Sequence, residues 1–287
     1  MSTVATTAPR GETRRAGPGK SHRSRWARYL LPTYSWLVIA YLVFPIAVMI
    51  AYSFNKVTTG LAQVSFGWNG FTTQWYQQWN GIPQLTAAFW LSIRVAIVAT
   101  LLSTVVGTLL ALALVRYRPP RFRGKTAIEQ VMFLIIAVPE IVLGASMLGL
   151  FVTLNLARGF LTLLLAHVTF SIAFVAVTVR ARLAGFDLSL EEAARDLGAN
   201  SWVTFRKITL PLIWPGIMAG ALMAFALSID DFVTSNFVSG SAVPFPVWIY
   251  GATRIGIPPQ VFVFGTALFT VGILCALASV VIGRKKA

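Results

Sequence analysis

Three carboxylates lie deep within apolar stretches of this sequence, at Glu140, Asp230 and Asp231. A charged side chain at bilayer depth costs at least about 2.5–3.5 kcal/mol, so it normally faces an interior cavity or a charged partner. Arg94 and His167 lie in two further apolar stretches, at depths that one of the aspartates is expected to share. The pattern predicts either an intramembrane polar cluster between helices or a route for a cation, and both interpretations remain open.

Few residues are suited to covalent or metal chemistry. The chain has one cysteine, Cys275, and two histidines, His22 and His167. One cysteine excludes a disulfide framework within the chain, and the set makes a Cys/His zinc site untenable. An enzyme would need a nucleophile, a base or a metal cluster at one depth, and the sequence gives that class little support. We therefore expect no catalytic residues, no metal and no cofactor.

The composition is that of a membrane protein. Hydrophobic residues make up 56% of the 287 residues and charged residues 11%, whereas a typical soluble domain is about one-quarter charged. A helix of about 20 apolar residues crosses the hydrocarbon core of a bilayer. The sequence predicts an all-α integral membrane protein with six such helices, at about 33–54, 86–115, 128–154, 160–180, 212–237 and 261–282.

The basic residues predict the orientation of these helices. Twenty of the 24 Lys and Arg residues fall in the N-terminal tail, in the segments 116–125 and 180–211, or at the C-terminus. Because basic residues accumulate on the cytoplasmic side, both termini are expected in the cytoplasm. Residues 1–28 are expected to form a disordered basic tail that touches lipid headgroups, and the aromatic-rich segment 55–85 an extracytoplasmic loop at the membrane interface.

No nucleotide-binding motif is found. The segment 17–21 (GPGKS) resembles the end of a phosphate-binding loop, but Arg14 stands where that loop needs its first glycine. The motif also needs a preceding strand, which is missing here. The protein is therefore expected to have no ATPase site of its own.

The cytoplasmic segment 186–211 is predicted to form two short helices. Ser189 and Glu192 have the spacing of a capping box, which marks a helix start. An apolar stripe follows on that helix, Gly198 suits a left-handed C-terminal cap, and Asn200 or Ser201 can begin a second helix. An exposed helix pair with small residues on one face is suited to docking into a groove on a partner, although a plain amphipathic surface helix has the same pattern.

The same segment resembles the EAA loop of type I ABC importer permeases, whose pattern is EAA-x3-G-x9-I-x-L-P. Every spacing of that pattern is present. The resemblance implies the type I permease fold over 86–282 and a coupling helix seated on a cytoplasmic ATPase. It assigns coupling to Glu191, Glu192, Ala193, Ala194, Gly198, Ile208, Leu210 and Pro211.

Three further segments, 139–144, 167–183 and 228–240, are similar to spermidine/putrescine permeases, and most similar to the second permease subunit of those systems. This resemblance implies a polyamine importer in a bacterial plasma membrane. Its partners would be two copies of an ATPase, a second and different permease, and an extracytoplasmic binding protein, with no nucleic acid. Permeases for iron, thiamine and other solutes share much of this scaffold, so another substrate is an alternative, as is an ion-gradient-driven secondary transporter.

A polyamine stays protonated at neutral pH, since amines titrate near pH 10. Carboxylates along a dry passage would offset the desolvation of its ammonium groups. Glu140 is the first candidate for such a role, followed by Asp231 and Asp230. Because adjacent helical residues point about 100° apart, one aspartate is expected to be structural and the other to line the route. Aromatic rings that could add cation–π contacts are Trp90, Phe174, Trp248 and Tyr250.

Overall fold

A computed structural model describes the backbone of residues 25–57, 67–116 and 124–284, and side chains over 29–57, 67–116 and 124–274. Within these ranges the fold is helical, and the only β-type pairing is one bridge between Asn55 and Phe71. The predicted all-α class is confirmed for this part of the chain.

The helices are α1 (Arg25–Tyr52), α2 (Gln74–Gln77), α3 (Pro83–Arg116), α4 (Lys125–Ala137), α5 (Glu140–Thr153), α6 (Phe160–Ala184), α7 (Ser189–Asp196), α8 (Ser201–Thr204), a π-helical segment η1 (Phe205–Thr209), α9 (Leu210–Asp230), α10 (Val233–Val238), α11 (Phe245–Ala252) and α12 (Gln260–Arg284).

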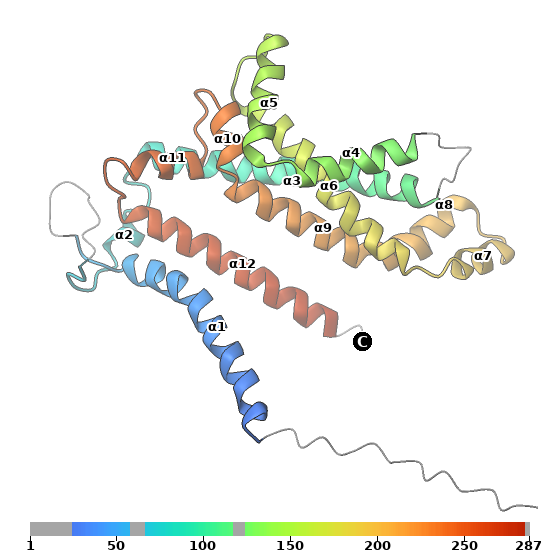
Figure 1. The fold of residues 1–287 in the computed structure, drawn as a ribbon, viewed down its shortest axis with the longest axis horizontal. Coiled ribbons are helices and arrows are strands. Elements are labelled where there is room, and N and C mark those ends of the chain that lie inside the picture. The colour runs from blue at the N-terminus through green and yellow to red at the C-terminus, as the bar shows by residue number, and fades with distance from the viewer. Residues whose placement is uncertain (1–24, 58–66, 117–123, 285–287) are drawn as a thin grey trace, which may run out of the picture. The chain divides into compact units, whose positions relative to one another are not determined.

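The packed centre of residues 50–287 is made by the three long helices α3, α6 and α9 (Figure 1). Each contributes buried apolar side chains to one shared core, among them Ala111 on α3, Val179 on α6 and Ile213 on α9. Such contacts between spans depend on close packing, because lipid tails are as apolar as the side chains themselves.

Two glycines allow this close packing. A Cβ atom on Gly107 of α3 would lie 2.8 Å from the Val175 Cβ on α6, and one on Gly220 of α9 would lie 3.3 Å from the same valine side chain. Val175 therefore fits between the backbones of α3 and α9, and α6 approaches both helices closely at this point.

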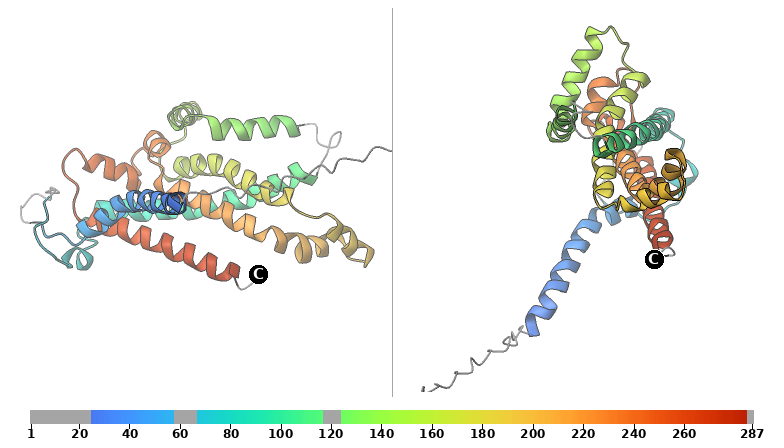
Figure 2. Two further views of the ribbon diagram at one scale, coloured as in Figure 1. Left: turned by 60° about the horizontal axis from the view of Figure 1, so that its bottom comes forward. Right: turned by 90° about the vertical axis from the view of Figure 1, so that its right-hand side faces the viewer.

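The apolar window 128–154, predicted as one span, is divided into α4 and α5, whose axes are bent by 112°. Val138 and Pro139 have extended backbone between the two helices. Proline disfavours helical geometry in the residue before it and cannot donate a backbone hydrogen bond, so the helix breaks at Val138 and Pro139. In Figure 2, α4 runs beside α6, whereas α5 turns away from α6.

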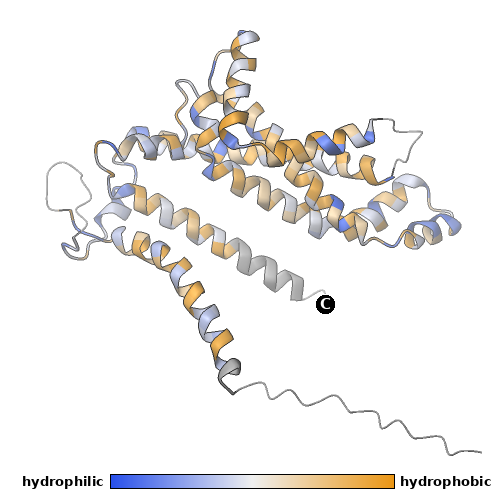
Figure 3. Ribbon diagram, in the orientation of Figure 1, coloured by the Kyte–Doolittle hydropathy of each residue, from blue (hydrophilic) through white to orange (hydrophobic). Residues whose placement is uncertain are grey.

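Four helices are long and apolar enough to cross a membrane among the described residues, or five if the bent pair forms one span. They include residues 29–52, α3, α6 and 201–230, and α12 adds a shorter apolar stretch over its described side chains. Hydrophobic residues cover these helices, whereas hydrophilic residues gather on α7 (Figure 3). The six-span count and the cytoplasmic termini remain predictions.

Residues 1–49 form a separate compact unit. Its described part is most of α1, an apolar helix that contains Pro32 and Pro45. The predicted basic tail and the GPGKS segment lie almost wholly in residues 1–24, outside the described residues.

Between residue 50 and the start of α3, aromatic side chains organise the segment predicted to be extracytoplasmic. Trp75 donates its indole N–H to the Asn55 carbonyl at 2.8 Å, and Phe54 stacks on both Phe71 and Tyr76. These contacts give a structural role to part of the aromatic cluster of the 55–85 loop.

Candidate functional site

The predicted coupling loop begins at α7, but its capping differs from the prediction. The N-cap residue is Leu188, no side chain caps the helix, and the capping box between Ser189 and Glu192 is therefore wrong. Instead the backbone N–H of Ser189 donates to Asp187 Oδ1 at 2.9 Å. This hydrogen bond, with one from the Ser189 side chain, lowers the pKa of Asp187. A carboxylate this close to a helix N-terminus is also favoured by the helix dipole.

The end of α7 has the predicted left-handed cap. Gly198 has φ of +82°. The Ala199 N–H donates to the Ala194 carbonyl at 3.0 Å, and the Gly198 N–H donates to the Arg195 carbonyl at 2.9 Å. These two bonds define a Schellman motif, in which glycine supplies the positive φ without strain. The turn between the two loop helices therefore depends on Gly198.

The second helix of the loop continues directly into α9. Asn200 Oδ1 accepts from the Val203 N–H at 2.9 Å, which confirms the predicted cap. Pro211 has no N–H to donate to the carbonyl four residues before it, and the turn ahead of it is the π-helical η1, closed by Leu210 N–H to Phe205 carbonyl. Ile208 is partly buried, and Leu210 packs against the α3–α6–α9 core. The motif residues thus connect the loop to a transmembrane helix.

Glu191 holds α7 against the transmembrane helices. It is only 4% exposed. Its Oε1 accepts a hydrogen bond from Arg116, the last residue of α3, and another from the Thr209 hydroxyl at 2.5 Å. Its Oε2 lies 3.3 Å from Arg195 on α7 itself. We call Arg116, Glu191 and Thr209 the coupling anchor. The EAA pattern places its glutamate at Glu192, but in the structure Glu192 is exposed and the neighbouring Glu191 is the buried one.

The loop exposes several large apolar side chains although most of its residues are hydrophilic. Leu197 is 89% exposed and Trp202 is 67% exposed, and Leu188 and Leu190 are exposed as well. Ala193 is exposed beside them and Ala194 is half-buried. Exposed large apolar side chains on an otherwise polar segment are typical of a surface that contacts another protein.

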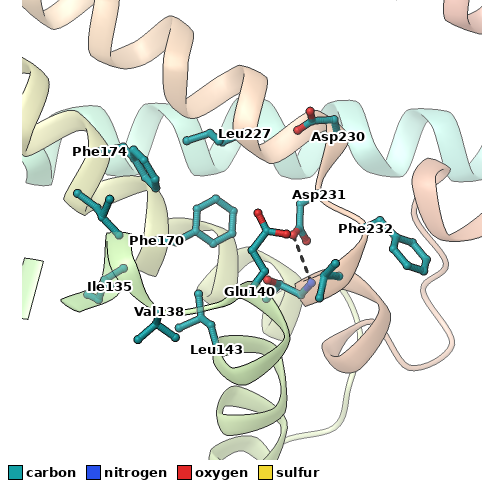
Figure 4. A pocket seen from close by; sticks show the side chains of 13 residues that line it. Ile135, Val138, Glu140, Leu143, Phe170, Phe174, Leu227, Asp230, Asp231 and Phe232 are labelled. Atoms are coloured by element: carbon teal, nitrogen blue, oxygen red, sulfur yellow. Dashed lines mark hydrogen bonds between the residues drawn. The ribbon is translucent and has the colours of Figure 1, made fainter. Parts of the chain in front are cut away.

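The three intramembrane carboxylates line one cavity. Glu140 at the start of α5, Asp230 at the end of α9 and Asp231 just beyond it all border a space of about 290 Å³ (Figure 4). The break between α4 and α5 forms one wall, and Phe170 and Phe174 of α6 form another. The broken span and the end of α9 therefore bring together acids that are about 90 residues apart in the sequence.

Of the two aspartates, Asp231 is the one whose carboxylate is held by other residues. Its carboxylate accepts from the N–H groups of Thr234 at 3.3 Å and Ser235 at 2.7 Å, at the start of α10. Its Oδ2 lies 3.4 Å from His167 Nε2 on α6. His167 is 2% exposed and also contacts the hydroxyls of Ser228 and Ser235. This group joins α6, α9 and α10 through polar contacts, whereas Asp230 is exposed.

Arg94 does not join that group. It is exposed on α3, and among the described residues no ion pair links it to a carboxylate. A fourth acid that sequence reasoning did not single out, Glu129 on α4, lies 3.0 Å from Arg180 on α6. Glu129 lies near the start of the window 128–154, and Arg180 lies at the end of another predicted span. These two positions could have indicated the ion pair.

The aromatic candidates divide between the cavity and the packed core. Phe174 lines the cavity, and Tyr250 packs on the cavity residue Phe232 with ring centroids 4.6 Å apart. Trp90 borders a separate apolar groove between α3, α9 and α12, and Trp248 packs in a core cluster.

A helical membrane bundle, an acidic cavity at a broken span and an apolar loop surface anchored to two spans define a membrane transport subunit. The chain matches, over residues 103–285, the model of the family described as "Binding-protein-dependent transport system inner membrane component". The protein belongs to this family and is a type I ABC importer permease of the inner membrane. Membership implies an ATPase and a substrate-binding protein as partners.

Individual relatives agree with this assignment. The chain is 39% identical over 258 residues to the spermidine/putrescine transport system permease protein PotC of Haemophilus influenzae, covering 90% of this chain and 97% of that one. It is 37% identical over 272 residues to the putrescine transport system permease protein PotI of Escherichia coli, covering 92% and 93%. The fold is similar, with a TM-score of 0.63 and 16% identity, to a bacterial ABC transporter involved in the import of alginate, covering 93% of this chain and 99% of that one.

Proposed function

We propose that this chain is the permease subunit through which an ATP-driven importer moves polyamines such as spermidine and putrescine. The observation that carries the substrate class is the convergence of Glu140, Asp230 and Asp231 on one cavity. The chain has only nine acidic residues, so three around one cavity is a strong concentration of negative charge. Similarity to PotC and PotI supports the same class of cargo.

The cavity suits a flexible chain with several ammonium groups. Carboxylates replace part of the hydration that each ammonium loses, and the attraction grows as water is excluded. Phe170, Phe174 and Phe232 offer ring faces and apolar surface for the methylene segments between the charges. In this proposal Glu140 and Asp230 contact the substrate, and Asp231 keeps the wall of the cavity in place.

The proposed assembly pairs the chain with a different permease, two copies of a cytoplasmic ATPase and an extracytoplasmic binding protein. The apolar surface around Leu197 and Trp202 docks on the ATPase. Closure of the ATPase would then shift the permease between outward and inward access, as a change in the population of two states.

Uptake into proteoliposomes that contain the whole assembly tests the function. We expect accumulation of labelled spermidine that requires ATP and the binding protein, and that excess putrescine inhibits. Uptake driven by an ion gradient without ATP would instead indicate a secondary transporter. Failure of any polyamine to compete, with transport of another solute, would show that the architecture serves a different substrate.

The turn at Gly198 gives a prediction for coupling. Apart from Gly198 and its two chain neighbours, no described residue has an atom within 4 Å of a Cβ built on Gly198, so a substitution there acts through the backbone φ of +82°. A left-handed non-glycine residue costs about 1–2 kcal/mol, and asparagine tolerates the conformation better than valine. We expect Gly198→Val to reduce the ATPase that copurifies with the permease roughly 5–30-fold, and Gly198→Asn to reduce it less.

Membrane insertion, measured by the yield of detergent-solubilised permease, serves as the control for both Gly198 variants and should not change. Equal ATPase recovery from wild type and Gly198→Val would contradict a role for this turn in docking.

A further inference from the structure

The coupling anchor connects the docking loop to two transmembrane helices at once. Arg116 ends α3, a helix of 34 residues, and Thr209 immediately precedes α9. Arg116 also donates to the Thr209 hydroxyl at 3.1 Å, so the two helix ends and Glu191 form a closed triangle of polar contacts. The Thr209 side chain is fully buried, and Glu191 is nearly so.

The far end of α9 reaches the acidic cavity. This helix has 21 residues, from Leu210 to Asp230, and is therefore about 31 Å long at 1.5 Å per residue. Asp230 lines the cavity at one end, while Thr209 contacts Glu191 at the other. One packed helix thus links the contact with Glu191 at one end to the acidic cavity at the other.

The apolar docking surface and the coupling anchor are formed by different side chains of the same short helix. Leu190 and Leu197 face outward, while Glu191 is buried against α3 and η1. A change at Glu191 therefore leaves the outward side chains of α7 chemically unchanged.

We infer that Glu191 is the positioning residue that transmits movement of the ATPase to the transport cavity, through its contacts with Arg116 and Thr209. The inference rests on the proposed coupling of this loop to an ATPase, and it adds that binding of the ATPase and transmission of its movement depend on separate residues. Loss of the anchor uncouples ATP hydrolysis from transport without releasing the ATPase.

The test uses the complete reconstituted assembly and measures three quantities: copurified ATPase, ATP hydrolysis and substrate uptake. For Glu191→Gln we expect normal ATPase recovery, uptake at least tenfold lower than in wild type, and at least a tenfold rise in ATP hydrolysed per molecule transported. Asp196→Asn removes one negative charge from the same helix at an exposed position, and should match wild type in all three.

Arg116→Gln provides an independent variant, because it leaves Glu191 bonded to Thr209 and Arg195. It should reproduce the uncoupling, and the double variant should be no worse than either single one, since the effects of residues that act as one unit are not additive.

Uptake per ATP within twofold of wild type for Glu191→Gln, additive effects in the double variant, or loss of ATPase recovery would overturn the inference. So would failure of both single variants to insert, because the pair would then serve folding alone. If wild type itself shows no ATP-dependent uptake, the proposed function fails instead.

Discussion

Replacing Glu140 with glutamine is expected to lower polyamine uptake by at least about tenfold while the assembly stays intact. Glu140 is exposed at the first turn of α5 and lines the cavity, and its carboxylate forms no hydrogen bond or ion pair among the described residues. At 4 Å and an effective dielectric constant of 20, a carboxylate and an ammonium attract by about 4 kcal/mol. Losing only about a third of that attraction is enough for a tenfold effect.

Glu140→Asp is the matched control, because it keeps the charge and shortens the side chain by one methylene. Its uptake should fall between those of wild type and Glu140→Gln, and Glu140→Lys should abolish uptake. All three variants should retain normal amounts of ATPase. Full-rate transport by Glu140→Gln would remove Glu140 from the substrate route.

The sequence predicted the coupling loop well, because the signals there are local. The positive φ of Gly198 and the cap by Asn200 depend on a few neighbouring residues, and both are present. The start of α7 was mispredicted because Ser189 already lies inside the helix: its N–H donates to Asp187 Oδ1, and the Glu192 N–H donates to the Leu188 carbonyl. A capping pattern does not fix at which of two nearby residues the helix begins.

Contacts between distant segments were harder to predict. The sequence indicated that Glu140, Asp230 and Asp231 need an interior site, but the 112° bend that puts Glu140 at a cavity could not be derived from Pro139 alone. Proline breaks a helix without fixing the angle between the two parts. The coupling anchor was likewise not predicted, since Arg116 and Glu191 are 75 residues apart in the sequence and α4, α5 and α6 lie between them.

The equal depth assigned to Arg94 and His167 illustrates the same limit. Counting 1.5 Å per residue places two side chains at one height, but it does not give the rotation of each helix. His167 faces α9 and α10 and reaches Asp231, whereas Arg94 is exposed. Two side chains in a polar cluster must lie at the same depth. They must also face each other, and the rotation of each helix decides that.

The two adjacent aspartates are expected to fail in different ways when each is replaced by asparagine. Asp231→Asn should destabilise the protein, because its carboxylate holds two N–H groups at the start of α10 and lies beside the buried His167. Hydrogen bonds to a charged group contribute about 1.5–3 kcal/mol, which corresponds to a fall of about 3–5 °C in melting temperature for a chain of this size. Asp230→Asn should leave the melting temperature unchanged and reduce uptake, since Asp230 is exposed in the cavity.

Melting of the purified permease in detergent and uptake by the assembly, measured on both variants, separate these roles. His167→Ala removes the other half of the buried pair, so it should lower the melting temperature like Asp231→Asn, and the double variant should add little because the two residues are in contact. A reversed pattern, with Asp230→Asn unstable and Asp231→Asn stable but inactive, would make Asp231 the substrate contact. The division follows from burial: a carboxylate already bonded to a helix end and a histidine has little capacity left for a passing ammonium, and its exposed neighbour retains that capacity.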